Sequence, residues 1–203
     1  MERLIVQLLN AIIQVLLFSF IPLIWWVFSG RKKEGFFSWV GLKLISNNDR
    51  KKVLLFSSIT LFVFIVLSVY ILFLLKDVQL ATSEFDGLGI TALPAAIVYS
   101  FIKTGLSEEI VFRGFILKRL SNKMNFTLAN IIQSILFGLL HGVLFFSFVN
   151  PVIAFIIIVF TGAIGWFMGY INEEKANGSI LPSWIIHGLS NLFSSIMAMF
   201  SII

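Results

Sequence analysis

The sequence contains no cysteine and few charged residues: Asp, Glu, Lys and Arg make up only 12% of its 203 residues. The lack of cysteine excludes disulfides and thiolate chemistry, so the redox compartment leaves no signature in the sequence. Soluble domains carry about 25% charged residues, whereas this chain is 59% hydrophobic. The composition therefore excludes an ordinary soluble domain and predicts an integral, multi-pass membrane protein.

Signs of a cleaved leader, an internal repeat or a low-complexity tail are also missing. The first apolar run is too long for a signal-peptide core and has no small-x-small cleavage site, so we expect it to be retained. We therefore predict one transmembrane domain over residues 1–203. It would consist of an N-terminal two-helix part, residues 1–88, and a four-helix core, residues 89–203.

Hydrophobic runs long enough to span a bilayer, roughly 20 residues each, predict about six transmembrane helices. They cover residues 4–28, 53–75, 93–120, 127–148, 152–171 and 181–202. A short amphipathic cytoplasmic helix is expected at residues 36–44. The predicted fold is all-α, a polytopic membrane helix bundle. Glycines at helical spacing in the fourth and fifth runs indicate close helix packing: Gly138, Gly142, Gly162, Gly165 and Gly169.

Positive charge predicts the orientation of the helices in the membrane. The loop after the first helix holds seven basic residues, which places it in the cytoplasm: Arg31, Lys32, Lys33, Lys43, Arg50, Lys51 and Lys52. Alternation then puts Lys118, Arg119 and Lys123 inside as well, and the acidic loop 76–88 and both termini outside. The net charge of +5 is thus explained by topology, and we expect no nucleic acid partner.

Three charged residues stand close together in the apolar run of residues 92–117: Glu108, Glu109 and Arg113. A fourth charged residue in this run, Lys103, is given no role. A charge at bilayer depth costs a few kcal/mol or more, so these residues need partners. Glu109 and Arg113 lie four residues apart and can pair along one helix face. Glu108 points about 100° away from Glu109 and is left for another partner.

The chain has two histidines, His141 and His187, and both fall inside predicted spans. His187 shares a helix face with Asn191, four residues later. Counted from the cytoplasmic ends, Glu108 and both histidines lie between that interface and mid-bilayer, so the three helices can bring them together. Each residue alone has a structural explanation, as an ion pair or an interhelical hydrogen bond. Together they are the ingredients of general-base or metal-assisted hydrolysis.

Three spaced motifs resemble one known family. They are Glu108-Glu109-x-x-x-Arg113, Phe137-x-x-x-His141 and His187-x-x-x-Asn191, with Phe112-Arg113-Gly114 and residues 181–186 as similar surroundings. The chain thereby resembles the CPBP family, the CAAX-protease and bacteriocin-processing enzymes, also called the Abi family of intramembrane proteases. The resemblance covers about residues 93–193. It implies an endopeptidase acting within the membrane, with residues 89–203 as the catalytic core.

The resemblance also implies a role for each motif residue. Glu108 would be the general base that activates a water, and His141 would hold or polarise that water. His187 and Asn191 would stabilise the oxyanion, while Glu109 and Arg113 would form a supporting pair. A cofactor is either absent or a single zinc ion held by Glu108, His141 and His187 with a water. We favour metal-free hydrolysis, because the His-Glu-x-x-His motif of zinc proteases is missing.

The expected partners are the lipid bilayer and a peptide or protein precursor. The chain looks like a bacterial plasma-membrane protein, for which the family suggests a bacteriocin or pheromone precursor or another membrane-associated peptide. One alternative is a non-catalytic role, as a membrane scaffold or a bacteriocin self-immunity protein. Another is a proton-coupled transporter, which is less favoured because the sequence shows no inverted repeat.

Overall fold

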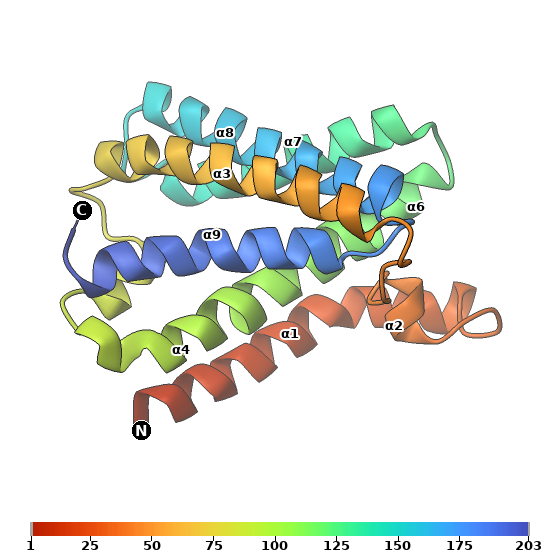
Figure 1. Ribbon diagram of the computed structural model, residues 1–203, viewed down its shortest axis with the longest axis horizontal. Coiled ribbons are helices and arrows are strands. Elements are labelled where there is room, and N and C mark those ends of the chain that lie inside the picture. The colour runs from red at the N-terminus through yellow and green to blue at the C-terminus, as the bar shows by residue number, and fades with distance from the viewer. Residues whose placement is uncertain (1, 203) are drawn as a thin grey trace.

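The computed structural model describes residues 2–202, and within them it is a helix bundle without strands. Six long helices lie where the hydrophobic runs predict them (Figure 1). Their bounds are α1 Glu2–Ser29, α3 Arg50–Leu74, a composite helix Gly89–Ser121, α7 Phe126–Phe145, α8 Pro151–Tyr170 and α9 Leu181–Met199. The predicted all-α fold is confirmed.

Five of these helices are long and apolar enough to cross a membrane, and α9 is not among them. The sequence carries His187, Asn191 and several serines along α9. Figure 1 shows α9 running through the middle of the bundle, with α3 on one side and α4 and α1 on the other. Because its neighbours are other helices, α9 needs less apolar surface than a helix that faces lipid.

The composite helix is built from short segments of different winding. They are η2 Gly89–Ala92, α4 Leu93–Ile97, η3 Val98–Leu106, α5 Ser107–Glu109, η4 Ile110–Leu117 and α6 Lys118–Ser121. Both η3 and η4 are π-helical, and they flank the two adjacent glutamates. Such widened turns are rare and occur often at functional sites. Hydropathy and the 3.6-residue period of an α-helix predict the membrane span. They do not predict these π-helical turns.

Several helix ends differ from expectation. The short cytoplasmic helix, α2 Phe36–Trp39, stops well before residue 44, because Gly41 takes a left-handed φ of +87° and its carbonyl accepts from the Ile180 amide at 2.8 Å. Where a loop was expected after the fifth span, α8 continues into the π-helical η5 Ile171–Lys175. The fourth and sixth helices each end three residues early. The acidic loop contains a 3₁₀ turn, η1 Ala81–Phe85.

Helices α7 and α8 pack closely through glycine, as the spacing predicted. A Cβ added to Gly138 would clash with the Ile158 carbonyl and come within 3.2 Å of the Gly162 Cα. A Cβ on Gly142 would clash with the Ile158 side chain. The backbones of α7 and α8 therefore lie so close together that positions 138 and 142 have no room for a side chain.

The loops that hold most of the basic residues meet at one end of the bundle, hereafter the basic end. Lys118 donates to Glu173 at 2.8 Å and to the Gly178 carbonyl at 2.7 Å. Ser179 donates to the Lys43 carbonyl at 2.6 Å. Both termini lie at the opposite end, away from α2 and α6 (Figure 1).

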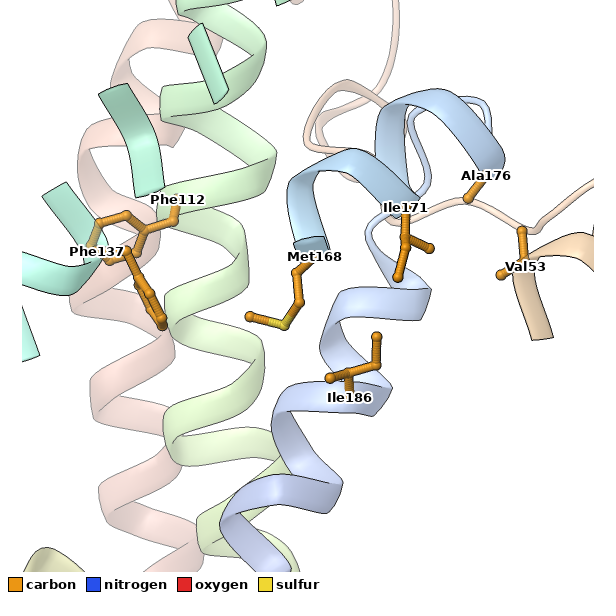
Figure 2. Close-up of a cluster of buried hydrophobic side chains, with 7 residues drawn as sticks. All are labelled: Val53, Phe112, Phe137, Met168, Ile171, Ala176 and Ile186. Atoms are coloured by element: carbon orange, nitrogen blue, oxygen red, sulfur yellow. The ribbon is translucent and has the colours of Figure 1, made fainter. Parts of the chain in front are cut away.

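A cluster of buried apolar side chains, hereafter the core cluster, packs between the composite helix, α7, α8, η5, α9 and the start of α3 (Figure 2). Its members are Val53, Phe112, Phe137, Met168, Ile171, Ala176 and Ile186. Figure 2 shows Met168 between the Phe112–Phe137 pair and Ile171 with Ile186. Each side chain is at most 6% exposed, so this part of the interior is dry.

Candidate active site

Three helices bring Glu108, His141 and His187 to one place. Glu108 comes from α5 of the composite helix, His141 from α7 and His187 from α9. The Glu108 Oε2 atom lies 3.9 Å from the Nε2 atoms of both histidines. These separations are too long for direct hydrogen bonds, and a water molecule commonly bridges polar groups at such distances. The structure therefore assembles the three residues that the sequence singled out on separate helices.

Hydrogen bonds fix the orientation of both imidazole rings. His141 Nδ1 lies 2.9 Å from the Phe137 carbonyl oxygen, and His187 Nδ1 lies 2.9 Å from Glu109 Oε1. Both partners only accept hydrogen bonds, so each Nδ1 carries the hydrogen and donates it. In the neutral ring, each Nε2 then presents a lone pair toward Glu108.

Glu109 holds two partners at one oxygen. Its Oε1 accepts from Arg113 Nη1 at 2.8 Å as well as from His187 Nδ1, and both Glu109 and Arg113 are fully buried. The spacing of four residues predicted the pair with Arg113. The contact with His187 was missed, because it joins residues 78 positions apart and no local pattern signals it. Glu109 thus positions a histidine in addition to supporting its own helix.

The Phe137 ring packs against three of the charged or titratable groups. The Arg113 guanidinium lies over this ring at 4.2 Å from its centroid, a favourable cation–π contact. The rings of His141 and His187 lie 4.5 Å and 6.0 Å away, centroid to centroid. Gly165 leaves room for both groups, since a Cβ there would come within 3.2 Å of Arg113 Nη2 and of the Phe137 ring.

Asn191 lies near the cluster but bonds to a different residue. Its Nδ2 donates to Thr104 Oγ1 at 2.7 Å, and Thr104 in turn donates to the Tyr99 carbonyl at 3.0 Å. Thr104 was missed in the sequence. Its signal was a polar side chain four residues before Glu108 in a helix that is mostly apolar. Thr104, on the composite helix, thereby holds the Asn191 amide in place.

These residues line a cavity of about 360 Å³ between α3, the composite helix, α7, α8 and α9. Glu108, His141, His187, Asn191 and Thr104 form part of its wall. Among the described residues, Glu108 is the only Asp, Glu, Lys or Arg that lines it, and most of the remaining wall is apolar. A concave, mainly apolar pocket with a few convergent polar groups is the usual form of a binding or active site.

The three candidate zinc ligands match zinc in kind but not in spacing. Imidazole Nε2 atoms whose Nδ1–H is bound to a carbonyl or carboxylate are common zinc ligands. Bonds of about 2.0 Å in a tetrahedral site would put ligand atoms about 3.3 Å apart, closer than the 3.9 Å observed. Within residues 2–202, no group of three or more His, Cys, Asp or Glu side chains meets the geometry of a metal site.

A model of the family described as type II CAAX prenyl endopeptidase Rce1-like matches residues 89–193, just over half of the chain. The chain belongs to this family. The Rce1-like match runs from the start of the composite helix to α9 and contains Glu108, His141, His187 and Asn191. Helices α1 and α3 lie outside it. At the level of the family, the match supports an intramembrane endopeptidase of the CAAX-protease type.

Searches of the curated proteins and of the solved structures return no significant match. The Rce1-like match and the five apolar helices together describe an integral, multi-pass membrane protein of a protease family.

Proposed function

We propose that this Rce1-like chain hydrolyses a peptide bond within the membrane by means of a water molecule activated by Glu108. The convergence of the Glu108 carboxylate with two imidazole Nε2 atoms at 3.9 Å, on the wall of a cavity, carries the proposal. A general base must lie within reach of the proton that it removes, directly or through one water. The Glu108 Oε2 atom is buried and has no hydrogen-bond partner among residues 2–202, so it is free to accept from that water.

In the proposed first step, Glu108 removes a proton from the water while the oxygen attacks the carbonyl carbon of the substrate. The His141 Nε2 lone pair accepts the second O–H of the water and fixes its direction. The carbonyl becomes a tetrahedral oxyanion, and the protonated Glu108 then gives its proton to the leaving nitrogen as the C–N bond breaks. The products are a new carboxyl group and a new amine.

Two groups are available to stabilise the oxyanion. Thr104 takes one N–H of the Asn191 amide, and a primary amide has a second N–H to offer. His187 donates from Nε2 only when its ring is protonated, because Nδ1–H is committed to Glu109. The Glu109 carboxylate stabilises that imidazolium, in the same way that a buried carboxylate orients the histidine of a serine protease. Donors fixed before the reaction contribute most in a dry site.

The cavity wall supports a substrate segment that is apolar and uncharged. Four phenylalanines and several aliphatic residues line it, including Phe64, Phe145 and Phe160. A charged segment would lose its hydration there without gaining an opposite charge other than Glu108. We propose a peptide or protein precursor held at the membrane, with the scissile bond in or beside an apolar stretch.

Substitutions at the site test the proposal in host cells in which this protein cleaves a membrane peptide. Glu108→Gln and His141→Ala are expected to abolish processing while the protein stays folded in the membrane, because each removes a group that acts on the water. Full biological activity in both variants would exclude the enzyme and favour a non-catalytic scaffold or an immunity protein. Glu174→Gln, which makes the same chemical change on an exposed carboxylate, is the matched control.

Zinc content tests the alternative in which Glu108, His141 and His187 hold a metal that activates the water. We expect elemental analysis of protein purified without chelators to find well below one zinc per chain, because Glu108 Oε2 lies farther from both Nε2 atoms than two ligands of one zinc ion lie from each other. Stoichiometric zinc that disappears in His141→Ala would overturn this expectation and make the three residues metal ligands.

A further inference from the structure

We infer that the active-site cavity opens on the non-cytoplasmic side of the membrane, and that the segment to be cleaved reaches it from that side. The inference rests on the proposed function, which makes the cavity the binding site of the substrate. The side on which the cavity opens is argued from the structure alone. It limits the substrate class to translocated or exported segments of membrane-bound precursors.

Positive charge indicates the orientation of the bundle in the membrane. Basic residues in short loops mark the cytoplasmic side of a membrane protein. Eleven of the fifteen Lys and Arg residues lie in the loops and helix ends at the basic end: Arg31, Lys32, Lys33, Lys43, Arg50, Lys51, Lys52, Lys118, Arg119, Lys123 and Lys175. The opposite end carries Arg3 and Lys76 against Glu2, Asp77, Glu84 and Asp86. The basic end is therefore cytoplasmic.

Packed side chains separate the active site from the cytoplasmic end. Between the site and the basic end, the core cluster fills the interior with side chains that are at most 6% exposed (Figure 2). Behind it, Lys118 of α6 bonds to Glu173 in η5 and to the Gly178 carbonyl in the connection that follows η5. The Asn172 side chain donates to Ser183 at 2.7 Å in the same region, and both residues are buried. Within residues 2–202, apolar packing and these hydrogen bonds therefore occupy the space between the cavity and the cytoplasmic end.

The cavity extends from the active site in the other direction. The α3 residues on its wall all belong to the second half of that helix, from Phe64 to Ile71 and Leu72, and Leu75 follows directly. Leu80, Ala81 and Thr82, from the acidic loop, also line it. Since α3 starts at the basic end, the cavity extends from Glu108 toward the acidic loop and away from the cytoplasm.

Polar side chains continue this route to the surface. On α9, Asn191 and Ser194 face the cavity, and the Ser194 hydroxyl lies 3.4 Å from that of Thr82 in η1. A second cavity of about 60 Å³ shares Thr82 and Ser194 with the first and reaches Lys76 and Asp86, which are exposed. Hydroxyl and amide groups along an otherwise apolar wall give water a path to Glu108, which hydrolysis requires.

A cavity that reaches the surface at the acidic loop favours a segment on that side of the membrane over a tail presented from the cytoplasm. It fits an apolar segment that has crossed the membrane, such as the outer part of a precursor's membrane anchor. The 3₁₀ turn η1 would lie beside the incoming segment, since Ala81 is exposed at the surface and also lines the cavity.

Cysteine labelling tests this inference, and the chain has no native cysteine to interfere. Single cysteines are placed at Ala81 and Ser194 on the cavity wall, at Asp77 in the acidic loop and at Lys123 in the basic loop. Bacterial spheroplasts carrying each variant are treated with a membrane-impermeant maleimide before and after permeabilisation. We expect Ala81→Cys, Ser194→Cys and Asp77→Cys to be labelled in intact spheroplasts, and Lys123→Cys only after permeabilisation.

Labelling of Lys123→Cys alone in intact spheroplasts would reverse the orientation and overturn the inference. Labelling of Asp77→Cys without either cavity position, or of the cavity positions only after permeabilisation, would also overturn it, because the route would be closed from outside. The same labelling in a Glu108→Gln background is expected to be unchanged. Labelling needs no catalysis, so a failure of the proposed activity and a failure of the access route give different results.

Discussion

Glu109 is the residue through which the buried charges and the histidines are connected. Its Oε1 accepts from both Arg113 and His187, and the carboxylate is fully buried. Glu108, its neighbour in the chain, faces the cavity and the two Nε2 atoms instead. Two adjacent carboxylates therefore have different surroundings, one bonded to Arg113 and His187 and one facing the cavity, which suits a positioning residue beside a general base.

Substitution of Glu109 by Gln is expected to lower the free energy of unfolding by about 3–5 kcal/mol, because it leaves the buried Arg113 without an opposite charge. The measurement is reversible unfolding in detergent. Activity should fall as well, since Gln holds the His187 ring without stabilising its charged form. The double variant Glu109→Gln/Arg113→Met is expected to recover stability and not activity.

Glu174→Gln is the control for this change, because Glu174 is exposed and the same substitution there removes no buried partner. A Glu109→Gln variant as stable as the wild type would show that the Arg113 charge is compensated elsewhere. Recovery of activity in the double variant would reduce Glu109 to a purely structural residue.

At the scale of the helix, the composite segment and α9 show where sequence periodicity stops being informative. The span 93–120 was predicted within a few residues, but its π-helical winding on either side of Ser107–Glu109 was not. Hydropathy likewise predicted α9 without indicating that it lies inside the bundle. Both features depend on contacts with other helices, which a periodic pattern along one segment does not contain.

Substitution of Gly138 by Ala tests the close approach of α7 and α8. The added Cβ would clash with the backbone carbonyl of Ile158, which cannot move without α8, so we expect a loss of about 1–3 kcal/mol of stability. His141 lies on the same helix, so activity is expected to fall too. Gly35→Ala is the matched control, because a Cβ there meets no atom within 4 Å.

Equal stability of the Gly138 and Gly35 variants would contradict this packing. Thermal unfolding of both variants in the same detergent provides the comparison.

At the scale of the whole molecule, much of the fold and part of the site could be predicted. Hydrophobic runs located the helices, and the spacing of Glu109 and Arg113 gave their ion pair. Glu108, His141 and His187 were singled out, because charged or polar residues stand out in apolar spans. The His187–Glu109 bond, the Thr104–Asn191 bond and the direction of the cavity could not be predicted, since each depends on how separate helices pack.

Comparative peptidomics tests the central claim, catalysis by Glu108, most directly. Membranes and medium are compared between cells that carry the wild type, Glu108→Gln or the control Glu174→Gln, all at equal protein levels. The proposed mechanism predicts peptide fragments that are present with the wild type and Glu174→Gln and absent with Glu108→Gln, with their uncut precursor accumulating in that variant. Identical fragment sets in all three would contradict it.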